Sequence, residues 1–176
     1  MEDKVSKIIE RKGFAKYGFL QPWEVTISHW IRIKCRFGCP SYGKCLACPP
    51  NTPSIEDCKN FFSEYSSAYM IHYEVNESAP EKRTNILRDV NNRLLELENE
   101  VYRMGYHKAF VMFIGPCNFC KKCTGDYPCQ HPVQRRPSLQ GMGVDFYKTA
   151  VTIGLPIDEE ITNDWIVNRY GMLLVE

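Results

Sequence analysis

The sequence predicts an α/β or α+β fold: a mainly parallel sheet of the βαβ type, with helices packed on it and two cysteine-rich loops at its carboxyl edge. Segments with strand patterns alternate with helical segments long enough to cross over a sheet, and such crossovers join parallel strands. The chain has 176 residues, of which 44% are hydrophobic, so it can bury a substantial core. We therefore expect a single domain spanning residues 1–176.

The amino-terminal segment, residues 3–12, predicts a helix because its apolar residues recur on one helical face and Gly13 follows as a stop. Residues 23–35 predict one strand or two short ones. Valine and isoleucine occupy only odd positions there, at Val25, Ile27, Ile31 and Ile33. This segment runs into the first cysteine loop, which its prolines stiffen.

A second helix is predicted from Ser54, because Ser54 and Asp57 form a variant of the capping box. Cys58 shares a helical face with apolar residues, so we expect it to be a buried core residue rather than a ligand. Residues 67–75 then predict a strand.

Residues 81–104 predict the longest helix, since apolar residues recur there at alternating spacings of four and three. Residues 107–115 are apolar almost throughout, which is typical of a central strand covered on both faces. A short helical segment over residues 144–153 and a final strand over residues 170–175 complete the expected elements. Asp145 is expected to cap or flank the short helix.

Eight of the nine cysteines form two groups of four, and each group has the spacing of a metal site. Thiolates two or three residues apart can converge on one ion or cluster, and four complete the shell of a tetrahedral zinc or of a cubane. We therefore predict eight metal ligands. The first group is Cys35, Cys39, Cys45 and Cys48, and the second is Cys117, Cys120, Cys123 and Cys129.

The spacing of Cys117, Cys120 and Cys123 is typical of three corners of a ferredoxin cubane. Cys129 follows after five residues instead of three. It either closes the same cluster, serves the other cluster or leaves one iron open, and His131 is a second candidate for the fourth corner. The first group is compatible with a cubane or with structural zinc. We expect two [4Fe-4S] clusters, with zinc as the alternative at the first site.

The sequence predicts a cytoplasmic protein without a membrane partner, because it has neither a signal-peptide pattern nor an apolar run of membrane-spanning length. In a reducing compartment, close-set cysteines bind metals rather than form disulfides. The net charge of +1 argues against a nucleic-acid partner. Basic residues nevertheless gather near the cysteines, either as solvated loop charge or to compensate a negative cluster: Lys34, Arg36, Lys121, Lys122, Arg135 and Arg136.

Three stretches of sequence resemble an uncharacterised prokaryotic family known only as predicted metal-binding proteins. They are Cys-Pro-x-Tyr-Gly-x-Cys-x-x-Cys-Pro-Pro from Cys39, Gly-Pro-Cys-x-x-Cys-x-x-Cys from Gly115, and Arg136-Pro-Ser followed by Gly143-Val-Asp. The resemblance covers most of the chain. It implies metal binding in a prokaryotic, often anaerobic setting, and it implies no reaction.

Three classes of function remain open. The first, which we place ahead, is an electron carrier or redox adaptor that docks a redox partner protein through its basic loops. The second is an enzyme with an open iron, for sulfur transfer or removal on a small anionic substrate that Arg135, Arg136 or His131 would orient; Asp145 and His131 are its acid–base candidates. The third is a zinc-stabilised binding module. If parallel strands carry both loops, the two sites share one face of the molecule. No oligomeric state follows from the sequence.

Overall fold

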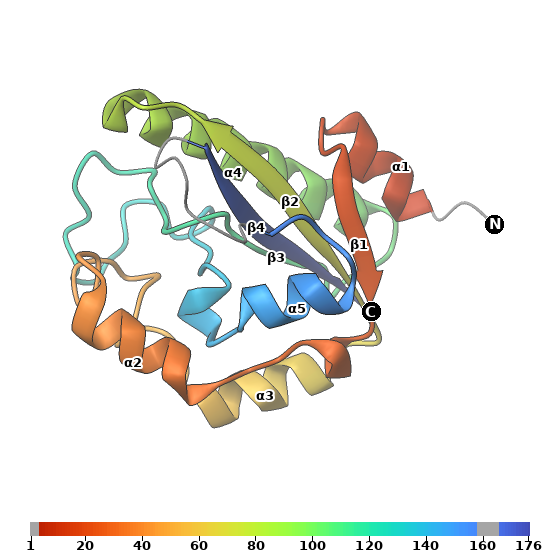
Figure 1. Cartoon of the computed structure of the whole chain (residues 1–176), viewed down its shortest axis with the longest axis horizontal. Helices are drawn as coiled ribbons and strands as arrows, with labels where there is room; N and C mark the ends of the chain where they lie inside the picture. The colour runs from red at the N-terminus through yellow and green to blue at the C-terminus, as the bar shows by residue number, and fades with distance from the viewer. Residues whose placement is uncertain (1–3, 158–165) are drawn as a thin grey trace.

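The computed structural model describes residues 4–157 and 166–176 and has an α+β fold (Figure 1). Its sheet has four strands in the order β1-β2-β4-β3. Their bounds are β1 Lys16–Leu20, β2 Ser67–Asn76, β3 Phe110–Met112 and β4 Ile166–Val175. All three pairings are antiparallel, so the expected parallel sheet is wrong.

The reason for this error lies in strand β4. Helix α4 (Pro80–Arg103) carries the chain from β2 to β3, as a βαβ crossover does. Strands β2 and β3 both run antiparallel to β4, so they point in the same direction. However, β4 lies between them and pairs with β2 over ten residues, from Ser67↔Val175 to Asn76↔Ile166. The crossover is present, but its two strands are not neighbours.

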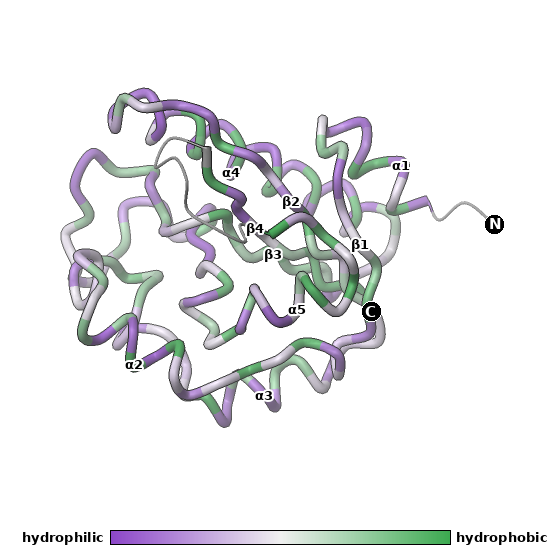
Figure 2. Tube along the Cα trace, viewed as in Figure 1, coloured by the Kyte–Doolittle hydropathy of each residue, from purple (hydrophilic) through white to green (hydrophobic). Residues whose placement is uncertain are grey.

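Helices cover both faces of the sheet. Helices α1 (Lys4–Arg11) and α4 pack on one face, and α3 (Ile55–Ser63) and α5 (Phe146–Thr152) pack on the other. Neighbouring residues of β2 therefore alternate between two cores: Tyr69 and Ile71 face α1 and α4, whereas Ala68 and Met70 face α3 and α5. In Figure 2 helix α4 alternates between hydrophobic and hydrophilic residues, as a helix with one buried face does.

The helices at residues 3–12, 81–104 and 144–153 are confirmed as α1, α4 and α5. Helix α3 is confirmed together with its capping box: Ser54 Oγ accepts a hydrogen bond from Asp57 N at 3.1 Å, and Asp57 Oδ2 accepts one from Ser54 N at 3.3 Å. The strands at residues 67–75 and 170–175 are confirmed as β2 and β4, whereas the strand expected over residues 107–115 contains only Phe110–Met112.

Residues 23–35 do not form the predicted strand. The segment contains a short 3₁₀ helix, η1 (Pro22–Glu24), and the beginning of helix α2 (His29–Gly38). Ile31 is buried on α2, but Ile33 is 55% exposed, so the period-two pattern did not mark one buried face. Ile27 makes an isolated bridge to Val144. Strand β1 was not predicted.

Candidate metal centre

The first cysteine loop follows helix α2 and turns back on itself. Gly43 N donates to Pro49 O at 2.9 Å, and the φ of Gly43 is 70°, which glycine adopts without strain. Cys48 N donates to Cys45 O at 3.0 Å, which closes a tight turn between these two cysteines. Arg32 of α2 holds the far end of the loop by donating from Nη1 to Thr52 Oγ1 at 2.6 Å.

The second loop leaves strand β3 and is anchored to helix α4. Ile114 N donates to Asn91 Oδ1 at 3.1 Å in the buried interior. Asn91 Nδ2 in turn lies 3.4 Å from Asn118 Oδ1, and Arg88 Nε donates to Asn118 O at 2.9 Å. Asn91 is a polar residue on the otherwise apolar face of α4. Its position in the sequence could therefore have indicated that α4 anchors a loop through a buried hydrogen bond.

The return of the second loop is fixed by a buried ion pair. Arg136 donates from Nε to Glu98 Oε2 at 3.0 Å, and its Nη2 contacts Glu98 Oε1. Glu98 Oε2 also accepts from Val111 N of β3 at 2.7 Å. Arg136 Nη1 donates to the carbonyls of Val133 and Arg135 at 3.0 and 2.9 Å. Arg136 is therefore used by the scaffold, and it does not fit the expected anion-orienting role.

The two loops meet at Cys45. Its sulfur accepts hydrogen bonds from the thiols of Cys117, Cys48 and Cys123, and Ala47 N lies 3.4 Å from the same sulfur. The bond from Cys117 is the largest cause that lowers the pKa of Cys45 below that of an ordinary thiol, followed by the bond from Cys48. The same bonds to Cys45, followed by burial, raise the pKa values of Cys48 and Cys117. The ionised form of the Cys45 side chain is therefore favoured, because neighbouring thiols can donate hydrogen bonds to its sulfur.

A small cavity of about 20 Å³ lies between these sulfurs. Its lining comes from both loops and includes Cys45, Cys117, Cys120, Cys123, Cys129, His131 and Arg135. Besides Ala47 N at Cys45, backbone N–H groups point at two more sulfurs: His131 N lies 3.4 Å from Cys129 Sγ, and Phe119 donates to Cys117. Such bonds stabilise thiolates and tune iron–sulfur centres.

Arg135 supplies a positive charge at this cavity. Its guanidinium lies 5.2 Å from the ring centre of Tyr127, and its Nη1 is buried without a hydrogen-bond partner in the described part of the chain. A buried guanidinium N–H beside five cysteines fits an anionic group, and a cluster bound by thiolates is anionic. The donor set therefore fits a thiolate-bound metal or cluster.

Cys35 and Cys39 lie on the other side of Cys48. All three line a second, larger cavity, which the small cavity's cysteines do not line. Burial, and next the neighbouring Cys39, raise the pKa of Cys35. The two groups of four along the sequence are therefore divided differently in space, because Cys45 lies beside Cys48 of its own group and also contacts Cys117 and Cys123 of the other.

The eight cysteines nevertheless occupy one end of the molecule, where both loops lie side by side (Figure 1). The expected shared face is found, although antiparallel strands and helix α2 produce it. Within residues 4–157 and 166–176, no group of three His, Cys, Asp or Glu side chains is arranged as an ion site as it stands. The small cavity has room for one ion or water, so a cubane requires the loops to move apart.

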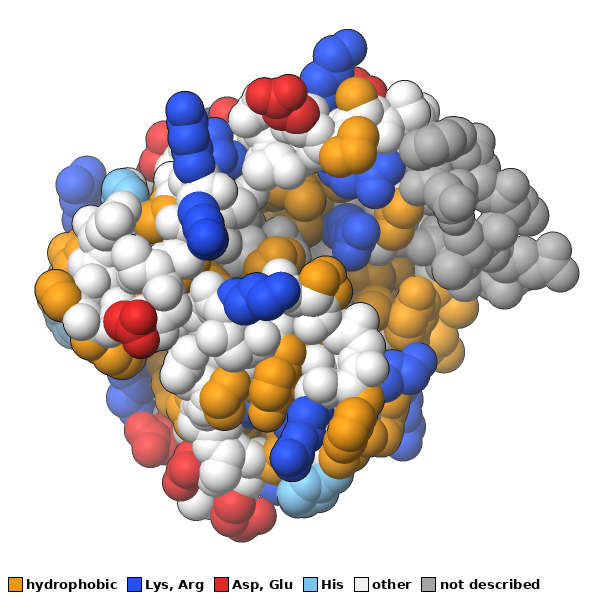
Figure 3. Space-filling view, turned by 90° about the vertical axis from the view of Figure 1, so that its left-hand side faces the viewer, with side chains coloured by type: hydrophobic (Ala, Val, Ile, Leu, Met, Phe, Trp, Pro, Cys, Tyr) orange, Lys and Arg blue, Asp and Glu red, His pale blue; other side chains and the backbone are white. Residues whose placement is uncertain are grey.

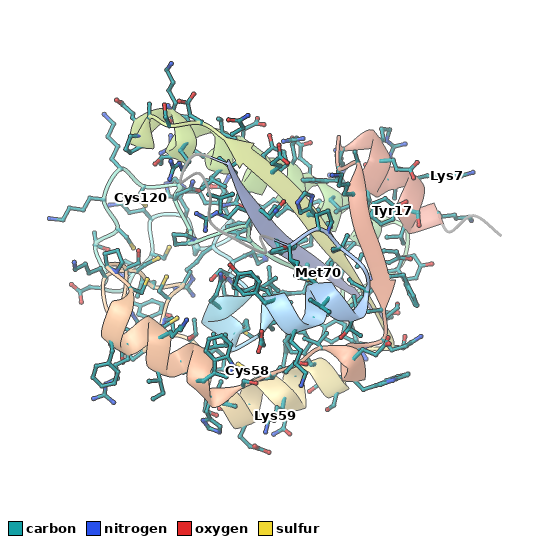
Figure 4. All side chains as sticks on the ribbon, in the orientation of Figure 1. Lys7, Tyr17, Cys58, Lys59, Met70 and Cys120 are labelled. Carbon is teal, nitrogen blue, oxygen red and sulfur yellow. The ribbon has the colours of Figure 1, made fainter. Side chains whose placement is uncertain are left out.

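Two residues have the structural roles expected of them. Cys58 is fully buried in α3, away from Cys120 of the second loop (Figure 4). Asp145 caps α5, since its Oδ1 accepts from Lys148 N at 3.1 Å, and its Oδ2 accepts from Trp30 Nε1 at 3.2 Å. Those contacts use both carboxylate oxygens for structure.

A family comparison is consistent with this chemistry. The chain belongs to the family described as Predicted metal-binding protein (DUF2284). The match covers residues 18–175 and so includes both cysteine loops. Neither curated proteins nor solved structures provide a significant match to the chain. No helix in the described ranges is long and apolar enough to cross a membrane.

Proposed function

We propose that this metal-binding protein holds two [4Fe-4S] clusters and transfers electrons, as a carrier or as a redox adaptor. The observation that supports it most is the meeting of both loops at Cys45, which lines one small cavity together with four cysteines of the second loop. Eight cysteines at one end of the fold match the ligand number of two cubanes. When bound, such clusters supply one-electron redox chemistry.

The positions of the cysteines suggest how the ligands divide. Cys117, Cys120 and Cys123 form one site, with Cys45 or Cys129 as its fourth ligand. Cys35, Cys39 and Cys48 form the other. Because Cys45 and Cys48 are neighbours in one turn, the two sites adjoin, and adjoining centres suit electron exchange within the protein.

The surface around the loops suits an acidic redox partner. Cys39 is exposed, so one site reaches the surface of the protein. Lys44, Lys121 and Lys122 are exposed on the same two loops. Figure 3 faces this end of the molecule and shows more Lys and Arg than Asp and Glu over its central part. A positive surface attracts an acidic partner and raises the rate of association at low salt.

Two other functions have a specific observation in their favour. The larger cavity beside Cys35, Cys39 and Cys48 favours an enzyme in which an open iron meets a small substrate. The ion-sized space between Cys45, Cys117 and Cys123 favours a zinc-stabilised module.

Metal analysis after anaerobic purification tests the proposal. We expect brown protein with about eight irons and about eight acid-labile sulfides per chain, which bleaches reversibly on reduction. Cys58→Ala is the matched control, since it removes a buried thiol outside both cavities and should keep full iron content. Colourless protein with stoichiometric zinc and no sulfide would refute the iron–sulfur proposal and favour the zinc module.

A further inference from the structure

Arg135 and Arg136 are neighbours in the sequence, but only Arg136 has a carboxylate partner. Arg136 pairs with the buried Glu98. In the described ranges Arg135 forms no ion pair, and its Nη1 is buried without a hydrogen-bond partner. A guanidinium keeps its charge in proteins, and a buried charged group without a partner is unfavourable. The structure therefore lacks a negative charge beside Arg135.

The position of the Arg135 side chain is fixed by two contacts within the second loop. Its backbone N donates to His131 O at 3.0 Å, which closes a turn. Its guanidinium lies 5.2 Å from the ring centre of Tyr127, where cation–π attraction holds it. The segment that carries Tyr127 also approaches the first loop, since a Cβ on Gly125 would lie 3.7 Å from Gly43 O. Arg135 is thus held near the contact between the two loops.

The small cavity is where the missing negative charge can bind. Arg135 lines it together with the five cysteines that meet there, and neither aspartate nor glutamate is among the described residues of its lining. Because the volume is only about 20 Å³, a group bound in this cavity lies close to every side chain of its wall. Arg135 carries the one permanent charge among the described lining residues. A metal or cluster held by several thiolates is anionic, so it would supply the charge that Arg135 lacks.

We propose that Arg135 donates a hydrogen bond from its guanidinium to a metal-bound sulfur in the small cavity, and that it thereby retains the metal and raises the reduction potential of the centre. Reduction adds a negative charge to a cluster, so a nearby cation and N–H donor favour the reduced state. The inference rests on the proposed function for the identity of the metal. A zinc ion with four thiolates is also anionic, so the hydrogen bond itself does not depend on that identity.

A redox titration of the anaerobically purified protein, followed by electron paramagnetic resonance, tests the inference. Arg135→Met removes the charge and the N–H donors but keeps a long flexible side chain. We expect the midpoint potential of one cluster to fall by about 59 mV, which is a tenfold change in a one-electron equilibrium, because a charge-assisted hydrogen bond contributes about tenfold. The midpoint of the other cluster should change less. Arg135→Lys keeps the charge and should recover about half of the shift.

Lys121→Met is the comparison for charge alone. Lys121 is exposed on the same loop and does not line the small cavity, so water screens its charge. The variant removes one positive charge, as Arg135→Met does, but its shift should be less than half as large. An equal shift in the two variants would show that Arg135 acts only through the net charge of the loop.

Metal release and the melting of the metal-free protein distinguish this role from a structural one. Arg135→Met should release metal to a chelator about tenfold faster, as is typical when a side chain that supports metal ligands is removed. The melting temperature of the metal-free protein should stay nearly unchanged, because Nη1 of Arg135 has no hydrogen bond to lose in the described part of the chain. An Arg135→Met protein that takes up no metal, while Arg135→Lys does, would also support the inference.

Unshifted midpoints together with an unchanged release rate in Arg135→Met would overturn the inference, and so would an equal shift in Lys121→Met. Iron, sulfide and zinc are measured on the same samples, which separates the two proposals. If the protein holds zinc and no iron, tenfold faster zinc release from Arg135→Met leaves the role of Arg135 standing and removes the proposed function. Two full clusters on which Arg135→Met has no effect would do the reverse, and protein that binds neither metal would overturn both.

Discussion

Replacing Glu98 by glutamine should destabilise the protein, because Glu98 is one partner of a buried ion pair with Arg136. The Glu98 side chain is 9% exposed and that of Arg136 is 18% exposed, so water screens this ion pair weakly. Glutamine has nearly the same volume and can still accept the hydrogen bond from Val111 N, so packing and that bond are preserved. What is lost is the negative charge that Arg136 requires.

The expected loss of unfolding free energy is about 3 kcal/mol, the lower end of the range for removing one partner from a buried ion pair, because Arg136 keeps some contact with solvent. For a chain of this length, each kcal/mol lowers the melting temperature by about 2–4 °C, so the midpoint should fall by about 6–12 °C. Without Glu98 to hold it in place, Arg136 no longer donates firmly to the carbonyls of Val133 and Arg135. The second loop should therefore release a bound metal to a chelator faster.

Chemical denaturation of the parent, Glu98→Gln, Arg136→Met and the double variant measures the coupling between the two side chains. The double variant should be less destabilised than the sum of the single variants by at least about 1 kcal/mol, as expected for residues in one buried pair. Asp89→Asn is the matched control on the same helix. Its carboxylate pairs with Arg93 at 3.2 Å but is 71% exposed, so the change should cost no more than about 0.5 kcal/mol. Equal costs for Glu98→Gln and Asp89→Asn, or a coupling near zero, would refute the argument.

Three further predictions test other parts of the structure. Cys120→Ser should lower iron content and weaken the second loop, whereas Cys58→Ala should retain all iron and cost about 1 kcal/mol; equal iron loss would make Cys58 a ligand. Gly143→Ala should be more destabilising than Gly154→Ala, because both positions have positive φ but only at Gly143 would a Cβ meet a neighbour, at 2.3 Å from Cδ1 of the buried Ile55 side chain, which must then move; equal melting temperatures would contradict this. Burial raises the pKa of Tyr65 to about 12 from 10.0. Between these pH values the unfolded chain loses a proton that the folded chain keeps, so the free energy of unfolding should fall as pH rises from 10 to about 12. The absorbance of tyrosinate in the folded protein measures the titration of Tyr65. If Tyr65 ionised with a midpoint near pH 10, the prediction would be wrong.

Elements with a long, regular pattern could be predicted from the sequence. Helix α4 repeats its apolar residues at spacings of four and three, and Val90, Leu94, Leu97 and Val101 are all fully buried. Helix α3 carried a local signal in its capping box. The apolar repeat and the capping box each involve residues of one helix only, so the sequence of that helix is sufficient to predict it.

Helix α2 shows where a short pattern is insufficient. Ile31 and Ile33 suit a strand by spacing, yet Ile33 lines the larger cavity instead of the core. Apolar residues that face a cavity have the same composition as core residues, and a segment of ten residues contains too few of them to distinguish the two periods. Strand β1 has the opposite problem: it is an edge strand of five residues with Gly18 at its centre, so its pattern is weak.

The direction of the sheet could not be predicted, because it depends on where β4 inserts. Residues 170–175 were expected to be a strand, but nothing in that segment identifies β2 and β3 as its neighbours. Both faces of the sheet are covered, so Ala68–Ile71 of β2, all of β3 and Tyr170–Val175 of β4 form apolar runs like those of a parallel sheet.

The cysteines were identified from their spacing, but their division in space was not. Spacing along the chain predicts which thiols a single loop can bring together, and it assigns Cys45 to the first loop. In the structure Cys45 packs against Cys117 and Cys123 of the second loop. Contacts between loops depend on the elements that support them.

The turn over residues 138–143 is that support, and it belongs to neither loop. Ser138 forms a parallel bridge with Phe113, at the point where the second loop leaves β3. A Cβ on Gly141 would lie 3.3 Å from Ala47 O, so the backbone of the first loop approaches this turn as closely as a glycine allows. Each loop is thus positioned against the same rigid turn, and their relative position follows without any strand in common. That is why an antiparallel sheet still brings Cys45 to Cys117, and why a metal shared across the loops would also fasten them to each other.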